Sequence, residues 1–112
     1  MYHNHCWEEV FGLAIHIANE NNSQITTDYL KNTFSPVMDR KQKSIENTID
    51  GMYDLGIIQY KFTRNKNNEF VKSIYIKGEW KKYFEKIQEQ YNTPEKVICK
   101  NRLEEKNLKT TR

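Results

Sequence analysis

The chain has 112 residues, 37% hydrophobic and 29% charged, a length that fits one domain with one core. Seven Tyr, five Phe and two Trp supply bulk for that core and argue against general disorder, whereas only four Gly and two Pro argue against a turn-rich β-sandwich. No apolar run approaches the roughly 20 residues of a membrane span, so we expect no membrane partner. Cys6 and Cys99 lie near opposite ends, and the first residues lack the pattern of a secretory signal, so a cytoplasmic location with two free thiols is expected.

The net charge of +3 is distributed unevenly along the chain. Residues 1–37 carry an excess of three acids, whereas residues 38–77 and 93–112 each carry an excess of three basic residues. Such a split favours a positive face on a nearly neutral body, which suits a polyanionic partner. The abundance of Asn, Lys and Ile is typical of AT-rich coding sequences, as in low-GC bacteria and their plasmids and phages.

A first helix is predicted for residues 3–21, because apolar residues recur there every three or four positions. Leu13 and Ile17 add a second apolar row, so we expect this helix to be buried on more than one side, against a further helix or a second subunit. A second helix follows, capped by Thr26 or Thr27, with Leu30 and Phe34 facing the core.

Pro36 predicts a boundary, because the residue before a proline is pushed away from helical geometry, and residues 34–39 are expected to form a turn. A third helix is then predicted from Asp39, as its N-cap, to Tyr53. Its inner side is expected to carry four apolar residues: Met38, Ile45, Ile49 and Met52. Gly51 and Gly56 are expected to loosen the end of this helix, and the segment 55–58 to turn the chain into a strand.

Residues 57–63 and 70–76 alternate between apolar and polar side chains, and the polar loop 64–68 between them predicts a β-hairpin. The apolar face is expected to carry Ile58, Tyr60, Phe62, Phe70, Ile74 and Ile76, with Lys72 among them. A last helix is predicted for residues 79–91. Residues 93–112 are expected to be a basic extension of a domain formed by residues 1–92, beginning with a short helix at Thr93-Pro94-Glu95 anchored by Val97 and Ile98 and then disordered.

This order of helix, helix, turn, helix, β-hairpin and helix resembles the winged helix-turn-helix superfamily over about residues 5–91. The resemblance rests on the helix pair 27–34 and 39–53, on the exit 52–58 and on the hairpin. It implies an α+β, mostly helical fold: a three-helix core with a helix-turn-helix, a β-hairpin wing and an additional C-terminal helix. It also implies that the third helix enters the major groove of DNA.

The resemblance implies three groups of DNA-binding residues. The recognition helix would offer Arg40, Lys41, Gln42, Lys43, Ser44 and Asn47, whose donors suit guanine and adenine edges. The wing would offer Lys61, Arg64, Asn65, Lys66, Asn67 and Lys72, with Asn68 also at its tip, to the backbone or minor groove. Thr27 and Lys31 would contact phosphates.

The function expected from these groups is sequence-specific binding of double-stranded DNA by a transcriptional regulator. One alternative is a plasmid segregation or replication adaptor that binds repeated sites and recruits a protein partner through residues 93–112. Another is a winged-helix interaction module that binds no nucleic acid, an alternative supported by the acids of the third helix. Two of these acids, Asp50 and Asp54, are expected to face outward on the C-terminal half of that helix, away from the groove. The basic residues of an exposed helix can also be no more than a solvated face.

The aromatic stripes of the first and last helices have two interpretations. Their members Trp7, Phe11, Trp80, Phe84 and Tyr91 either fill the core of one chain or form the seam of a homodimer, and we expect a homodimer, since two copies read two half-sites. His3, His5 and Cys6 lack the further ligands of a zinc site. The sequence also lacks a phosphate-binding loop and a nucleophile elbow, so no metal, cofactor or enzymatic activity is expected.

Overall fold

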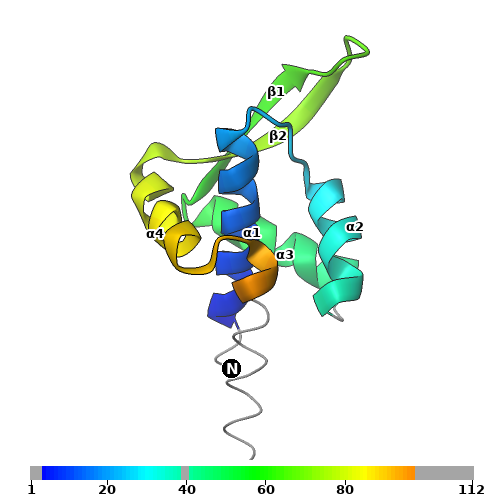
Figure 1. Ribbon diagram of the computed structural model, residues 1–112. Helices are drawn as coiled ribbons and strands as arrows, with labels where there is room; N and C mark the ends of the chain where they lie inside the picture. Colours follow the sequence, from blue (N-terminus) through cyan, green and yellow to red (C-terminus); the bar gives the residue numbers. More distant parts are fainter. Residues whose placement is uncertain (1–3, 39–40, 98–112) are drawn as a thin grey trace, which may run out of the picture.

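The computed structural model describes residues 4–38 and 41–97 (Figure 1). In chain order, the elements are α1 (Asn4–Glu20), α2 (Thr27–Met38), α3 (Gln42–Asp54), β1 (Ile58–Arg64), β2 (Phe70–Ile76), the short 3-10 helix η1 (Gly78–Trp80) and α4 (Lys81–Tyr91). Residues 94–97 add one more helical turn. The predicted α+β, mostly helical class is confirmed, with a two-stranded antiparallel hairpin after three helices.

Helix α1 is the centre of the molecule, with α4, α3 and β2 packed around it (Figure 1). Val10, Phe11, Leu13 and Ile15 are all fully buried. The second apolar row of this helix is therefore covered by elements of the same chain, at Leu13 completely and at Ile17 in part.

Helix α2 begins as predicted, because the Thr26 hydroxyl accepts a hydrogen bond from the Tyr29 N–H at 3.1 Å and so caps the helix. The predicted turn at residues 34–39 is wrong, since α2 runs through Pro36 to Met38. Pro36 has no N–H to donate to the carbonyl four residues before it, so the last turn has to be held by other contacts. The buried Phe34, whose ring lies edge-on to Phe11 with centroids 5.7 Å apart, holds this last part of α2 against the core.

Helix α3 starts later than predicted. Its N-cap is Lys41, without a side-chain capping bond, so the assignment of Asp39 as N-cap is wrong; Asp39 and Arg40 lie outside the described residues. Met38 belongs to α2, because that helix continues beyond its proline. The predicted inner side is otherwise confirmed, since Ile45, Ile49 and Met52 are buried.

The exit from α3 confirms the role expected of the glycine. Gly56 has a φ of 78°, a left-handed conformation, directly after the C-cap Leu55. The Ile57 N–H donates to Met52 O at 3.0 Å and the Gly56 N–H to Tyr53 O at 3.0 Å. This pair of bonds is a Schellman cap, which ends the helix and directs the chain into β1.

Strands β1 and β2 pair in an antiparallel register that runs from Ile58 opposite Ile76 to Arg64 opposite Phe70. The base of the hairpin is core, with Ile58, Ile74 and Ile76 buried. The predicted alternation is confirmed, but Phe62 and Phe70 are exposed, because the hairpin extends beyond the body of the protein (Figure 1).

The C-terminal part of the fold covers the other side of α1. Phe84 and Ile87 of α4 are buried, as is Val97 in the helical turn 94–97, which starts at Pro94 as predicted. Packing therefore extends past residue 92, where we expected the compact domain to end. The remainder of the predicted basic extension, residues 98–112, lies outside the described residues.

Candidate nucleic-acid interface

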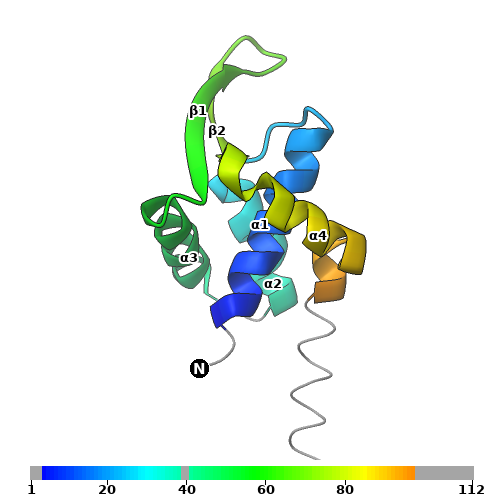
Figure 2. The same cartoon turned by 90° about the vertical axis from the view of Figure 1, so that its left-hand side faces the viewer.

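Helix α3 and the hairpin lie on one side of the molecule, and α4 lies on the other (Figure 2). The rings of Tyr53 in α3 and Tyr60 in β1 have centroids 5.2 Å apart and join the two elements. Burial raises the pKa of Tyr60, against the opposing effect of a hydrogen bond with Thr27. We name the surface formed by residues 41–47 of α3 and by the hairpin, residues 58–76, the α3–hairpin face.

The predicted cations of the hairpin are held in place by aromatic rings. Lys61 Nζ lies 5.1 Å from the ring centroid of Tyr75, and Lys72 Nζ lies 4.3 Å from that of Tyr60. The Arg64 guanidinium lies 4.5 Å from the ring centroid of Phe70. Such cation–π contacts orient a charge while leaving it accessible, and Lys61, Arg64, Lys66 and Lys72 are all exposed.

The tip of the hairpin is an ordered turn built by its asparagines. Asn65 Oδ1 accepts hydrogen bonds from the N–H groups of Asn67, at 2.9 Å, and Glu69, at 3.0 Å. Asn68 has a φ of 64°, and its Oδ1 accepts a bond of 2.6 Å from Arg64 Nη1. The predicted DNA ligand Asn65 therefore shapes the turn, while the exposed Asn67 lies at the tip.

The hairpin is braced from its other face. Thr63 and Ser73 lie on the face opposite the phenylalanines, and their hydroxyls are 2.9 Å apart. Gln24, in the connection between α1 and α2, donates from Nε2 to Thr63 Oγ1 at 2.5 Å and to Arg64 O at 3.1 Å. Nothing in the sequence pattern pointed to Gln24, because its two partners lie about 40 residues further along the chain.

At the start of α3, Lys41, Lys43 and Asn47 are exposed, as predicted for a recognition helix. Gln42 is also exposed, and its Nε2 donates to Asn32 Oδ1 of α2 at 3.2 Å. Arg40 lies outside the described residues. The outward face of this first part of α3 is therefore formed by Lys43 and Asn47, one helical turn apart.

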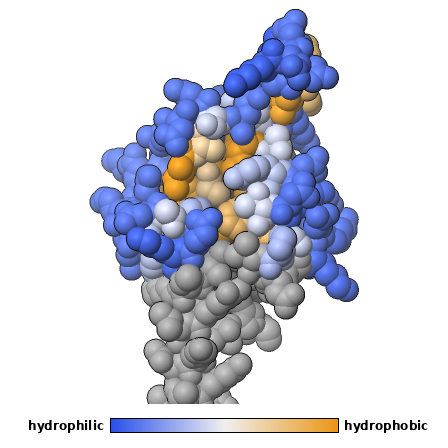
Figure 3. Space-filling model, turned by 45° about the vertical axis from the view of Figure 1, so that its right-hand side comes forward, coloured by the Kyte–Doolittle hydropathy of each residue, from blue (hydrophilic) through white to orange (hydrophobic). Residues whose placement is uncertain are grey.

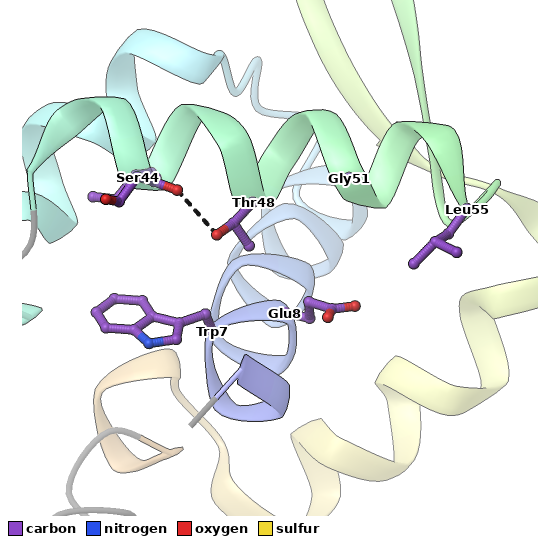
Figure 4. A pocket seen from close by; sticks show the side chains of 7 residues that line it. Trp7, Glu8, Ser44, Thr48, Gly51 and Leu55 are labelled. Carbon is purple, nitrogen blue, oxygen red and sulfur yellow. Dashed lines mark hydrogen bonds between the residues drawn. The ribbon is translucent and has the colours of Figure 1, made fainter. Parts of the chain in front are cut away.

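The structure does not bring Ser44 to that face. Ser44 lines a pocket of about 240 Å³ between α3 and the start of α1, together with Trp7, Glu8 and Thr48 (Figure 4). The Thr48 hydroxyl donates to Ser44 O at 3.0 Å, along the same flank of α3. A position only one residue from Lys43 differs by about 100° in direction around a helix, which separates the two side chains.

One of the acids of α3, Glu46, pairs with two of the predicted cations. Glu46 Oε2 lies 3.2 Å from Lys31 Nζ, and Glu46 Oε1 lies 3.2 Å from Lys43 Nζ. Lys31, predicted to contact phosphate, also lies 3.4 Å from Asp28 Oδ1. Hydrogen bonds with Lys31 and then Lys43 lower the pKa of Glu46, and those with Glu46 and Asp28 raise the pKa of Lys31.

The pairing of Lys43 with Glu46 has the i,i+3 spacing of a helical ion pair and was readable in the sequence. The pairing of Lys31 with Glu46 was not, because it depends on how α2 packs against α3. Lys31 is thus occupied within the helix pair, and its side chain is only 20% exposed.

Two further acids share the outward side of α3. Asp50 and Asp54 are exposed, and the spacing of four, three and four residues from Lys43 through Asn47 and Asp50 places all four within a sector of about 60°. Their outward position is as expected, and they lie in the same sector as Lys43 and Asn47, further along the helix. They continue the stripe of Lys43 and Asn47 and restrict any contact with a polyanion to the first turns of α3.

The predicted dimer seam is largely the core of a single chain. Phe11 is fully buried and Phe84 is 2% exposed, each packed between α1 and its neighbours. Trp7, Trp80 and Tyr91 are partly buried against the same core. Two members of the proposed seam are thus unavailable to a second subunit.

An apolar hollow of about 360 Å³ lies between α1, α2 and the turn 94–97 (Figure 3). Its apolar lining includes Ala14, Ile17, Ala18 and Phe34. Within residues 4–38 and 41–97, no three His, Cys, Asp or Glu side chains are placed to hold a metal ion. None of the described helices is long and apolar enough to cross a membrane.

No protein-family model, curated protein or solved structure matches the chain. The geometry and charge of the α3–hairpin face are therefore the basis for assigning a function.

Proposed function

We propose that the chain is a winged-helix protein that binds double-stranded DNA, with the hairpin as its wing and the first turns of α3 beside it. The observation that carries this proposal is the charge of the hairpin. Residues 58–76 contain four basic residues and one acid, an excess of three that equals the net charge of the whole chain. The other charges of the chain sum to zero, because the acids of residues 1–37 offset the basic residues of 93–112. Among the described helices and strands, the hairpin carries the largest excess of positive charge and should attract a polyanion most strongly.

The placement of these charges supports a duplex as the partner. A projecting ribbon with ordered cations can follow a phosphate backbone, while Lys43 and Asn47 on the same side of the molecule suit base edges in the adjacent groove. Lys61, Arg64 and Lys72 are already oriented by their rings, so little side-chain entropy is lost when they bind. The proposed biological role is that of a sequence-specific transcriptional regulator.

Fluorescence anisotropy with a labelled duplex at several salt concentrations tests the proposal. The triple variant Lys61→Gln, Lys66→Gln and Lys72→Gln should lose at least about tenfold in affinity and flatten the salt dependence by about two to three ion equivalents. The matched control is Lys81→Gln, Lys82→Gln and Lys86→Gln on α4, which removes the same charge from exposed residues of another element. Equal losses in both variants, or no salt-dependent binding by the wild-type chain, would overturn the proposal.

Sequence specificity is tested separately by selecting bound duplexes from a random pool. The wild-type chain should enrich a defined site, and Asn47→Ala should relax the preference at one position, because each good base contact discriminates by about 1–3 kcal/mol. If Asn47→Ala and Lys43→Ala enrich the same site as the wild-type chain, then α3 does not contact the bases and only the wing contacts DNA.

A protein-interaction module is the second candidate, favoured by the carboxylates of Asp50 and Asp54 on the outward stripe of α3. These acids repel a phosphate backbone but suit a basic protein surface. Asp50→Asn with Asp54→Asn separates the two functions: DNA affinity should rise or stay level if α3 lies against DNA. The second candidate is supported if the chain binds no duplex but binds a partner protein, and if these substitutions abolish that binding.

Dimerisation remains a prediction within this proposal, since two copies would read two half-sites. Its surface would have to use the partly exposed members of the stripes, which are Trp7 of α1, Trp80 of η1 and Tyr91 of α4. A monomeric mass in light scattering at micromolar concentration would contradict it.

A further inference from the structure

The face of the hairpin that is core at its base continues outward as two largely exposed aromatic rings. In the strand register, Phe62 lies opposite Lys72 and Phe70 opposite Arg64, so all four side chains share the face of Ile58 and Ile76. Phe62 is 70% exposed and Phe70 is 65% exposed. Two large apolar rings left in water on a projecting ribbon mark a surface that is built for contact.

We propose that this aromatic face is a wedge, in which Phe62 or Phe70 enters a base step of duplex DNA from the minor groove and bends the duplex. The inference rests on the proposed function and adds what the hairpin does to the DNA. Apolar side chains that enter base steps partially unstack them and kink DNA by about 20–90°.

The charges around the rings favour DNA as the occupant. The Arg64 guanidinium lies 4.5 Å from the centroid of the Phe70 ring, and Lys72 stands directly across the ribbon from Phe62. A base step has the complementary arrangement, with apolar base faces flanked on both sides by phosphates. Cations beside an inserted ring would neutralise the phosphates that a kink brings closer together.

The ribbon that carries the rings is braced from behind. Gln24 bonds to Thr63 and to the Arg64 carbonyl from the opposite face, and the Thr63 and Ser73 hydroxyls join the strands behind the rings. The Asn65 turn closes the tip. Unstacking a base step costs free energy, which the contacts with DNA must supply. A mobile loop would lose part of that binding free energy in becoming ordered, whereas a braced ribbon does not.

Energy transfer between dyes at the two ends of a short duplex, measured at saturating protein, tests the wedge. The wild-type chain should increase the transfer, and Phe62→Ser with Phe70→Ser should abolish the increase. This variant should keep the salt dependence of binding, because its cations remain, and lose less than about tenfold in affinity. Tyr29→Ser, at an aromatic residue of α2 that is 54% exposed, is the matched control and should bend DNA like the wild type.

A second measurement compares an intact duplex with one that carries a single mismatch. The wild-type chain should bind the mismatched duplex more tightly, since a base step that is already weakened costs less to unstack. The phenylalanine variant should bind both duplexes equally.

The outcomes separate the wedge from the proposed function. If the wild-type chain binds no duplex, both fail. If it binds with a steep salt dependence but bends DNA no more than the phenylalanine variant does, the wedge alone is overturned. Binding to anionic phospholipid vesicles that is lost in the phenylalanine variant, without any bending of DNA, would also overturn it and assign the face to a lipid surface.

Discussion

Gly12 of α1 lies directly against the ring of Phe84 of α4: a Cβ at Gly12 would fall 2.1 Å from Cε1 and 2.2 Å from Cζ of that ring. A glycine inside a helix costs about 0.5–1 kcal/mol relative to alanine. Here the missing side chain makes room for Phe84, so the aromatic residue of α4 reaches the centre of the core.

The substitution Gly12→Ala should therefore destabilise the protein by at least about 1–3 kcal/mol, because the added methyl group forces α4 away from α1. Urea denaturation followed by circular dichroism measures the loss. The control is Gly51→Ala in α3, where no atom outside its own stretch of helix lies within 4 Å of the added carbon and a gain of about 0.5–1 kcal/mol is expected. Equal stability of the two variants would show that α1 and α4 are not packed in this way.

Asn19 fastens the hairpin to α1. Its Nδ2 donates to Ile74 O at 3.1 Å and its Oδ1 accepts from the Ile76 N–H at 3.0 Å. Asn19→Ala should cost about 1–3 kcal/mol, because both backbone groups of β2 lose a partner. Hydrogen exchange at the Ile76 amide should accelerate, whereas Asn21→Ala, at an exposed position, should leave it unchanged.

Glu46 limits the affinity for DNA, if α3 contacts DNA at all. Glu46→Gln should release Lys43 from its carboxylate, while Lys31 keeps Asp28, and should tighten binding severalfold, with a salt dependence steeper by up to about one ion equivalent. Glu85→Gln on α4 makes the same change in charge at an exposed residue of another element. Indistinguishable affinities in the two variants would mean that α3 does not approach the phosphates.

The same carboxylate predicts a pH dependence of stability. Because Lys31 and Lys43 lower the pKa of Glu46, its contribution to folding is present above the ordinary glutamate pKa and is lost as the pH falls through the lowered value. The difference in unfolding free energy between the wild-type chain and Glu46→Gln should thus be present at pH 7 and decline under acid conditions. A difference that stays constant down to about pH 2 would contradict this linkage.

Gly56 is required for its backbone conformation and not for lack of space around it. Its φ is 78°, and apart from its chain neighbours nothing lies within 4 Å of the position that a Cβ would take. Gly56→Ala should cost roughly 1–2 kcal/mol from the left-handed conformation alone. Gly78→Ala, also in open space but without a positive φ, should be close to neutral, and a similar loss in both would refute a purely conformational origin.

Local patterns were sufficient to predict most of the fold. The apolar spacing of α1 and α3, the alternation of the two strands, the cap at Thr26 and the glycine exit at Gly56 depend on neighbours within a few residues. The end of α2 was mispredicted because the rule for Pro36 is local, whereas the packing of Phe34 on Phe11 that retains the last turn is not.

The candidate site was less predictable, because a sequence does not show which charged side chains pair with each other in the folded chain. Lys31 looked like a free cation, but the packing of α2 against α3 brings it to Glu46, which already pairs with Lys43 within α3. Phe62 and Phe70 looked like core, because alternation gives the face of a strand but not where the body of the protein ends.

By itself, the sequence determined the order and type of the elements, the hairpin and its excess of positive charge, since periodicity, turn chemistry and composition are properties of short segments. Only the tertiary structure decided that Phe11 and Phe84 are core, that Gly12 admits Phe84, that Ser44 turns to a pocket beside Trp7 and that two phenylalanines stay in water. These outcomes depend on contacts between residues far apart in the chain, which form only when the helices and the hairpin are packed together.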